Sequence, residues 1–216
     1  MRGCLPIPAI YTDQDFEHAC PANYVAVEPG LNPFKLKIWA MARSPYEKTL
    51  FLDTDTWILK SVEPIFALLD EGYEWCIAPR PDFTLVNGAL TLLAYQHATD
   101  DNTGVIAFRK SPAVSRLFDR WHSAICNQDE TQILPGTYCD QWYFNAKVKG
   151  SPEYSALRKL TLNPKEWNLR SFALRKAIAD GAIAETRILH TRPYESRAYC
   201  QIELFSLLNS RLGFTV

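Results

Sequence analysis

The chain of 216 residues has little net charge, −1 at neutral pH. Proteins that bind nucleic acid through its phosphates need a basic surface, and this composition gives no reason to expect one. No stretch approaches the ~18 apolar residues of a membrane-spanning helix. The start, Met1-Arg2-Gly3, leads into prolines and not into the apolar core of a signal peptide. We therefore expect no nucleic-acid partner, no membrane span and a soluble, cytoplasmic protein.

The sequence also lacks paired cysteines, repeats and linkers. Its six cysteines are scattered without a Cys-X-X-Cys pair, which favours neither a zinc site nor a disulfide framework. We expect them to be mostly reduced core residues. Hydrophobic residues make up 47% and charged residues 22%, an ordinary globular composition. The length fits one domain, so we expect residues 1–216 to form a single domain.

Local patterns predict strands that alternate with helices. Two helices begin at Asn32-Pro33 and Ser111-Pro112, where a capping side chain precedes proline. Their expected apolar stripes are Phe34, Ile38, Met41 and Ala42 in the first, and Val114, Leu117, Phe118, Trp121 and Ile125 in the second. Strands are expected at 5–12, 49–53, 75–79, 105–108 and 182–189, and an amphipathic helix at 195–212. This alternation predicts an α/β fold with a mainly parallel mixed central sheet flanked by helices.

One stretch, Thr49 to Thr56, points to chemistry. Three apolar residues run into Asp53 and Asp55, which reads as a buried strand that ends at a site. Alternate residues of a strand point to the same side, so the two carboxylates would lie about 6–7 Å apart. Their repulsion favours a divalent cation with oxygen ligands. The alternative is an Asp-rich turn that holds no metal.

Other polar residues also stand at the ends of predicted elements. Lys37 lies beside an apolar helix stripe, where it either extends along the edge of the core or holds phosphate. Asp140 and Gln141 begin a short helix, His190 ends a late strand, and a polar turn, Asp101 to Gly104, precedes a buried strand. The alternatives are a helix cap for Asp140 and Gln141, an ordinary strand-end histidine for His190, and a simple turn for the polar stretch.

The order of these motifs resembles a known family. Phe51-Leu52-Asp53-Thr54-Asp55-Thr56 is followed by Asn102-Thr103-Gly104, Asp140-Gln141 with Asn145, Trp167-Asn168, and a strand that ends in His190. This set resembles the nucleotide-diphospho-sugar transferases of the GT-A (Rossmann-like) fold, especially the glycogenin-like and related sugar transferase families. The resemblance runs from residue 5 to residue 193 and includes the Asp-X-Asp (DXD) triplet.

The resemblance implies roles for individual residues. Asp55 and His190 would bind Mn²⁺ or Mg²⁺, and Asp53 would contact the metal or the nucleotide ribose; imidazole suits Mn²⁺ better. Asn102 and Gly104 would line the donor-sugar pocket, whereas a turn role is the alternative. Asp140 and Gln141 would face the sugar or acceptor, unless they only cap a helix. Further donor contacts would come from Asn168, Lys37 and Arg192, and for Asn168 a simple loop hydrogen bond explains the residue equally well.

The implied reaction moves a sugar from a nucleotide diphosphate, with a UDP-sugar as the expected donor, to a glycan, protein or small molecule. A bound metal would neutralise the charge that develops on the leaving diphosphate, and Lys37 or Arg192 would assist. Two departures from the family pattern stand out. The chain starts after the place of the family's first strand, and His190 is followed by Thr191-Arg192-Pro193 where the glycogenin-like pattern has Gly and then Lys.

Two other functions use the same residues. A remnant or binding module would keep the fold without the donor pocket, which the short N-terminal region favours. The Asp53-Thr54-Asp55 triplet also resembles the first motif of haloacid-dehalogenase-type phosphatases, in which Mg²⁺ lies beside a nucleophilic aspartate. That family needs a later lysine motif and a second acidic pair, which are not found in order here.

Overall fold

The computed structural model describes residues 9–12, 23–27, 32–80, 83–86, 89–92, 100–127 and 139–191. They belong to two compact units, each assembled from two stretches of chain. Unit 1 comprises Met1–Thr49 and Arg109–Leu157, and unit 2 comprises Leu50–Phe108 and Arg158–Val216. The single domain expected from the length stays a prediction. The expected helix at 195–212 and Arg192 lie outside the described residues.

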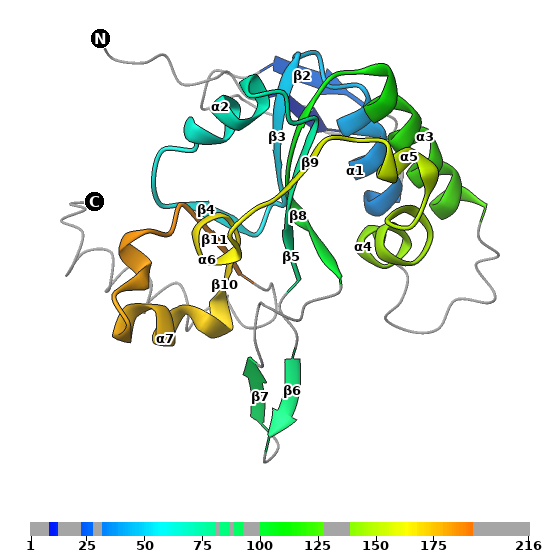
Figure 1. The fold of residues 1–216 in the computed structure, drawn as a ribbon. Helices are drawn as coiled ribbons and strands as arrows, with labels where there is room; N and C mark the ends of the chain where they lie inside the picture. Colours follow the sequence, from blue (N-terminus) through cyan, green and yellow to red (C-terminus); the bar gives the residue numbers. More distant parts are fainter. Residues whose placement is uncertain are drawn as a thin grey trace, which may run out of the picture. The chain divides into compact units, whose positions relative to one another are not determined.

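Unit 1 is mostly helical. Its strands β1 and β2 pair in parallel, and its helices α1 and α3 pack against each other (Figure 1). The elements are β1 (Ala9–Thr12), β2 (Asn23–Ala26), α1 (Pro33–Ala42), α3 (Pro112–Cys126), α4 (Asp140–Tyr143), the π-helical turn η3 (Phe144–Val148) and α5 (Pro152–Ser155).

Both predicted helix starts of unit 1 are confirmed. The Asn32 side chain accepts hydrogen bonds from the backbone N–H groups of Phe34 and Lys35, and Ser111 accepts one from Val114. All five residues of the predicted α3 stripe are buried. The α1 stripe is narrower than predicted: Ile38 and Met41 are buried, but Ala42 is exposed.

Unit 2 holds most of the strands. Strands β3 and β8 each reach the boundary with unit 1. The elements are β3 (Lys48–Leu52), β4 (Thr56–Ile58), α2 (Pro64–Asp70), β5 (Trp75–Pro79), β6 (Phe83–Val86), β7 (Ala89–Leu92), β8 (Asp101–Arg109), β9 (Lys159–Thr161), α6 (Pro164–Trp167), β10 (Leu169–Arg170), the 3₁₀ turn η4 (Ser171–Ala173), α7 (Leu174–Ala179), the 3₁₀ turn η5 (Ala182–Ala184) and β11 (Ile188–His190).

The strands confirm a mixed α/β fold. A four-stranded sheet has the order β3-β8-β5-β9, and a three-stranded sheet has the order β10-β11-β4. Strand β5 is antiparallel to β8 and parallel to β9, while β11 is parallel to β10 and antiparallel to β4. Strands β6 and β7 form a separate antiparallel pair in a region for which the sequence predicted no structure.

One irregularity shapes the site. The sequence predicted a polar turn before the strand at 105–108, but β8 already begins at Asp101. The pairing with β5 jumps from Ile77 opposite Ile106 to Ala78 opposite Asn102. Such a bulge bends a strand and redirects its side chains, and here it falls at Thr103, Gly104 and Val105, between the paired residues Asn102 and Ile106. The prediction failed because a bulge depends on the partner strand and has no local sequence signal.

The core of unit 2 lies between α2 and the four-stranded sheet. Ile65 and Leu69 of α2 are fully buried against Cys76 and Ala78 of β5 and against their β8 neighbours. Both faces of β5 and β8 are buried, which explains the apolar runs at 75–78 and 105–108. This packing gives the ends of β3, β8 and β11 fixed positions.

Candidate functional site

The first part of the site is the turn between β3 and β4. Asp53 and Asp55 were expected to extend a strand, but β3 ends at Leu52, and Asp53 to Asp55 form a turn. Thr56 closes this turn because its backbone N–H and its hydroxyl both donate to the Asp53 carbonyl, at 3.1 and 2.7 Å. The Asp53 N–H donates to the Gly104 carbonyl at 2.8 Å. The carboxylates therefore converge through a turn tied to β8.

His190 joins them from far along the chain. Strand β11 pairs antiparallel with β4 so that His190 lies opposite Thr56. The backbone N–H and hydroxyl of Thr191 both donate to the Asp55 carbonyl, at 2.9 and 2.8 Å. These bonds bring the end of β11 to the acidic turn, as the sequence predicted for the late strand.

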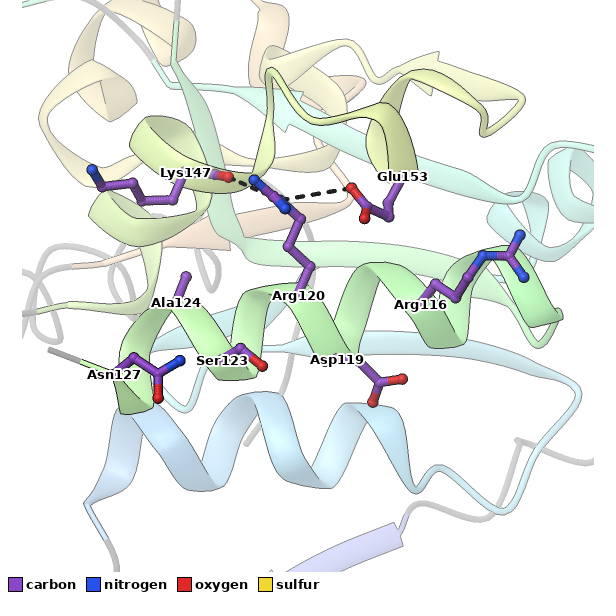
Figure 2. Close-up of a pocket in the computed structure, with 8 residues that line it drawn as sticks. All are labelled: Arg116, Asp119, Arg120, Ser123, Ala124, Asn127, Lys147 and Glu153. Carbon is purple, nitrogen blue, oxygen red and sulfur yellow. Dashed lines mark hydrogen bonds and ion pairs between the residues drawn. The ribbon is translucent and has the colours of Figure 1, made fainter.

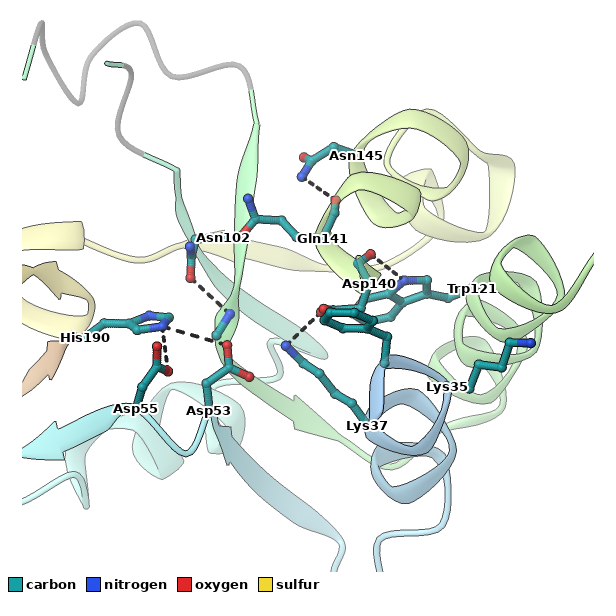
Figure 3. Close-up of polar contacts among 12 residues, drawn as sticks. Lys35, Lys37, Asp53, Asp55, Asn102, Trp121, Asp140, Gln141, Asn145 and His190 are labelled. Carbon is teal, nitrogen blue, oxygen red and sulfur yellow. Dashed lines mark hydrogen bonds and ion pairs between the residues drawn. The ribbon is translucent and has the colours of Figure 1, made fainter. Parts of the chain in front are cut away.

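Asp53, Asp55 and His190 form one cluster of potential metal ligands (Figure 3). Nε2 of His190 lies 3.0 Å from Oδ1 of Asp55 and 3.8 Å from Oδ2 of Asp53. One ligand atom from each residue lies within 4.8 Å of the other two. His190 is buried and the two aspartates are partly exposed, so the cluster opens to solvent on its carboxylate side.

The electrostatics of the cluster follow from burial. Burial lowers the pKa of His190 below 6.5, and the positive charge of Arg170 acts in the same direction against the pull of Asp55. Burial alone would raise the pKa of Asp55, but the bond and charge of His190 hold it below 3.8. A neutral His190 supplies no such charge. Because His190 is only 4% exposed, its lowered pKa prevails, and its imidazole is neutral near pH 7.

A chain of hydrogen bonds stands behind His190. The Gly104 N–H donates to Oδ1 of Asn102 at 3.0 Å, and Nδ2 of Asn168 donates to the same oxygen at 2.8 Å. Oδ1 of Asn168 lies 2.9 Å from Nδ1 of His190. Asn102 and Asn168 are almost fully buried. Asn168 is the capping residue that follows α6 and precedes β10, outside both elements.

Gly104 leaves space for the imidazole. A Cβ atom at this position would stand 2.1 Å from Cε1 of His190 and 2.8 Å from Oδ2 of Asp53. Both distances are far shorter than van der Waals contact, so only glycine permits this arrangement. Gly104 was predicted in the donor pocket, and the structure places it directly against two metal-ligand candidates.

Sequence reasoning missed Arg170. It is buried in β10, which pairs in parallel with β11 so that Arg170 lies opposite His190. Its positive charge acts on both Asp55 and His190. A buried cation near two carboxylates is a candidate for binding an anion. The only sequence signal was an arginine two residues after Trp167-Asn168, and the pairing of β10 with β11 is not visible in the sequence.

The residue types suit a divalent metal ion. Two carboxylates and a neutral imidazole are ligands that Mn²⁺ accepts, and the imidazole makes the set less suited to Mg²⁺. A histidine whose second ring nitrogen is held by an amide is typical of metal sites. The cradle that a Cβ at Gly104 would fill supports the same interpretation. Asp53, Asp55 and His190 therefore fit the group that the sequence resemblance implied.

The other predicted residues that the structure describes lie in unit 1. Nζ of Lys37 lies 2.7 Å from Oδ2 of Asp140, and both side chains are nearly buried. The Asp140 carbonyl accepts a bond from Nε1 of Trp121 at 3.0 Å (Figure 3). Asn145 donates to the Gln141 carbonyl at 2.9 Å. Lys37 thus pairs with a carboxylate, and its two expected roles, extension along the core edge and phosphate binding, stay predictions.

Unit 1 also carries a groove along α3 that sequence reasoning did not suggest. It has a volume of about 610 Å³, and in it Arg120 faces Glu153 at 3.7 Å (Figure 2). It contains none of the predicted site residues. Its lining is Arg116, Asp119, Arg120, Ser123, Ala124, Asn127, Lys147 and Glu153.

Within the described part of the chain, no helix has the length and apolarity needed to cross a bilayer.

Comparisons with known proteins give only distant likenesses. No family model matches the chain, and no curated protein matches it. Three similar solved structures are glycosyltransferases. One, involved in the glycosylation of the major capsid of PBCV-1, has 14% identity and a TM-score of 0.49, with 85% of this chain and 83% of that chain covered.

Two further structures are larger proteins. GlyE of Streptococcus pneumoniae TIGR4 has 14% identity and a TM-score of 0.48, with 78% of this chain and 40% of that chain covered. The bifunctional glycosyltransferase WbbM has 14% identity and a TM-score of 0.44, with 76% and 33% covered. The chain thus spans less than half of either. At these values the likeness is one of general arrangement, and function has to be argued from the site.

Proposed function

We propose that this protein is a metal-dependent glycosyltransferase that moves a sugar from a nucleotide-diphosphate donor to an acceptor. The observation that carries the proposal is the convergence of Asp53, Asp55 and His190, with one ligand atom of each within 4.8 Å of the others. The motif order that resembles GT-A transferases supports it, because six of the motif residues meet in unit 2. They are Asp53, Asp55, Asn102, Gly104, Asn168 and His190.

The metal-ligand residues would bind Mn²⁺, or Mg²⁺ more weakly. The bound ion would neutralise the charge that develops on the nucleoside diphosphate as the sugar–oxygen bond breaks. Asp53 and Asp55 supply two negative charges, and the neutral imidazole of His190 adds a ligand without a third. The two carboxylates would offset the +2 charge of the ion. Stabilisation of the negatively charged diphosphate would therefore need a further cation.

Arg170 is our candidate for that cation. It is buried, and it lies opposite His190 in the strand pairing. A guanidinium can bind two phosphate oxygens at once, which suits a diphosphate leaving group. This role was expected of Lys37 or Arg192. Lys37 is held by Asp140, and Arg192 keeps its predicted role only as a proposal.

Asp140 and Gln141 keep their predicted role toward the sugar or acceptor as part of this proposal. The ion pair with Lys37 would hold the Asp140 carboxylate ionised and in one orientation. A UDP-sugar is the donor that the sequence resemblance favours, and the acceptor remains open between a glycan, a protein and a small molecule.

The proposal is tested by thermal shift with nucleoside diphosphates and nucleotide-sugars, with and without Mn²⁺. A ligand that binds the folded state raises the melting temperature as it saturates the site. We expect a Mn²⁺-dependent shift in the wild type that is lost in Asp55→Asn. Glu185→Ala, an exposed acid of unit 2, is the matched control and should keep the shift.

Hydrolysis assays separate the remaining possibilities. Metal-dependent hydrolysis of a nucleotide-sugar supports the transferase. Faster hydrolysis of a simple phosphomonoester would support the phosphatase that the Asp53-Thr54-Asp55 triplet also resembles. If the protein hydrolyses neither substrate and no nucleotide changes its melting temperature, the remnant or binding module is the remaining possibility, and the proposal is wrong.

A further inference from the structure

We infer that Asn168 is a positioning residue for His190: oriented by Gly104 and Asn102, it fixes which imidazole nitrogen carries the proton and directs the lone pair of Nε2 toward Asp53 and Asp55. That this arrangement serves metal binding rests on the proposed function. The arrangement itself rests only on hydrogen-bond geometry. It differs from the donor-sugar contacts that the sequence resemblance implied for Asn102 and Asn168.

This series of hydrogen bonds starts at the backbone N–H of Gly104. A backbone N–H can only donate, so the Asn102 atom that lies 3.0 Å from the Gly104 nitrogen is the carbonyl oxygen, Oδ1. Gly104 is itself held in place, because its carbonyl accepts the Asp53 N–H at 2.8 Å. The orientation of the Asn102 amide therefore follows from the backbone of β8.

The orientation of Asn168 follows from that of Asn102. The Asn168 atom at 2.8 Å from Oδ1 of Asn102 is Nδ2, since an oxygen there would face another acceptor. Oδ1 of Asn168 must then point the other way, toward His190. Asn168 is 1% exposed, so water cannot replace either bond without reopening the core.

The orientation of Asn168 determines which nitrogen of His190 is protonated. Oδ1 of Asn168 accepts only, so Nδ1 of His190, at 2.9 Å, carries the proton. A neutral ring then has its lone pair on Nε2, which lies 3.0 Å from Oδ1 of Asp55 and 3.8 Å from Oδ2 of Asp53. Two acceptors at 3.0 Å repel unless a proton or a cation lies between them. The orientation therefore prepares Nε2 as a metal ligand.

The rival explanation is that Asn168 only ends α6. Its backbone N–H donates to the Pro164 carbonyl at 3.0 Å, and this bond does not involve the side chain. A substitution that keeps the volume of the side chain would then be harmless to the site. Loss of a partner that orients a metal-binding histidine instead weakens metal binding, about 10- to 100-fold in known sites.

The first test uses the wild type alone. A long-range ¹H–¹⁵N correlation spectrum of the metal-free protein at pH 8 shows which nitrogen of each imidazole is protonated. The sequence has four histidines, and the His190 signals are those absent from His190→Gln. We expect His190 to carry its proton on Nδ1. A proton on Nε2 alone would mean that the ring donates to Asp55, and the inference would be wrong.

The second test compares two substitutions at the same position. Asn168→Asp keeps an acceptor for Nδ1–H but loses the bond to Oδ1 of Asn102, whereas Asn168→Leu keeps a similar volume and loses both bonds. We expect Mn²⁺ affinity, measured by the electron paramagnetic resonance signal of free Mn²⁺, to stay within several-fold in Asn168→Asp. It should fall about 10- to 100-fold in Asn168→Leu, with the proton of His190 redistributed toward Nε2.

The outcomes separate this inference from the proposed function. Equal Mn²⁺ affinity in the two variants would overturn the positioning role. A wild type that binds no Mn²⁺ but protonates His190 on Nδ1 would contradict the proposed function and leave the positioning role supported. If Asn168→Leu does not fold, the wild-type spectrum decides.

Discussion

At the scale of single residues, Gly104 shows how a backbone requirement can define a site. Its missing side chain makes room for the His190 ring, while its N–H and carbonyl hold Asn102 and Asp53. A glycine in a strand normally weakens it, so its presence here is best explained by the close approach of other groups. The same residue thus sets both the space and the hydrogen bonds of the cluster.

Gly104→Ala is expected to disrupt the site. The added Cβ would stand 2.1 Å from Cε1 of His190, so the ring or the strand has to move. Overpacking of this kind costs about 1–3 kcal/mol of unfolding free energy, and we expect Mn²⁺ binding to be lost as well. Urea denaturation and Mn²⁺ titration measure the two effects.

Gly150→Ala is the matched control. Apart from the two adjacent residues, no atom lies within 4 Å of a Cβ built at Gly150, so the stability and Mn²⁺ affinity of Gly150→Ala should be close to those of the wild type. If Gly104→Ala also bound Mn²⁺ like the wild type, the packing of His190 against Gly104 would be wrong.

His190 predicts how stability depends on pH in the metal-free protein. Burial lowers its pKa below 6.5 in the folded state, so the unfolded state binds the proton more readily. The contribution of His190 is therefore fully present above pH 6.5 and is lost as the pH falls toward the folded pKa. We expect unfolding free energy to drop over this range, and less steeply in His190→Gln. Urea denaturation at several pH values measures this, and parallel curves for the two proteins would contradict it.

At the scale of elements, the sequence predicted what depends on neighbours along the chain. The caps Asn32 and Ser111 and the α3 stripe are local signals, and all three are confirmed. The late strand is confirmed only at its end: Ile188–His190 form β11, whereas Ala182–Ala184, predicted in the same strand, form the 3₁₀ turn η5. These features need no knowledge of which segments pair, so periodicity and capping chemistry suffice.

The features that the sequence did not predict depend on pairing between distant segments. Strand β8 begins earlier than expected and runs antiparallel to β5, with a bulge at the site. Arg170 lies opposite His190 only because β10 pairs with β11. The amide orientation of Asn168 is fixed, through Asn102, by the backbone of Gly104, which lies 64 residues earlier in the sequence. No local pattern carries such information.

The ion pair between α1 and α4 predicts a strong coupling. Lys37 and Asp140 lie 2.7 Å apart with side chains only 10% and 7% exposed. Removal of one partner of a buried pair leaves the other charge uncompensated, so Lys37→Met should cost about 3–5 kcal/mol of unfolding free energy.

The double variant Lys37→Met/Asp140→Asn serves as the control for that change. It should recover much of the loss, because no isolated charge is left. A double-mutant cycle by urea denaturation measures the coupling, and additive effects of the two substitutions would show that the pair contributes nothing.

At the scale of the whole molecule, each unit is assembled from two separate stretches of chain. Unit 2 takes its acidic turn from the first stretch and His190 from the second. Its core also combines Ile65, Cys76 and Val105 with Leu162 and Ile188 from the later stretch. The metal-ligand candidates therefore form only when unit 2 is complete.

A shortened chain that ends at Leu157 tests this dependence. It lacks β9, the parallel partner of β5, and β11, the antiparallel partner of β4. We expect no cooperative unfolding transition of unit 2 and no Mn²⁺ binding, as measured by circular dichroism and Mn²⁺ titration. A shortened chain that still binds Mn²⁺ with wild-type affinity would mean that His190 is not a ligand.

The central claim is that one divalent cation is held jointly by the acidic turn and by the imidazole of His190. Pulsed electron paramagnetic resonance of the Mn²⁺-loaded protein tests it most directly, because a histidine ligand produces a nitrogen hyperfine coupling. The account predicts this coupling in the wild type and its loss in His190→Gln. A Mn²⁺ spectrum without nitrogen coupling, or one unchanged by that substitution, would contradict it.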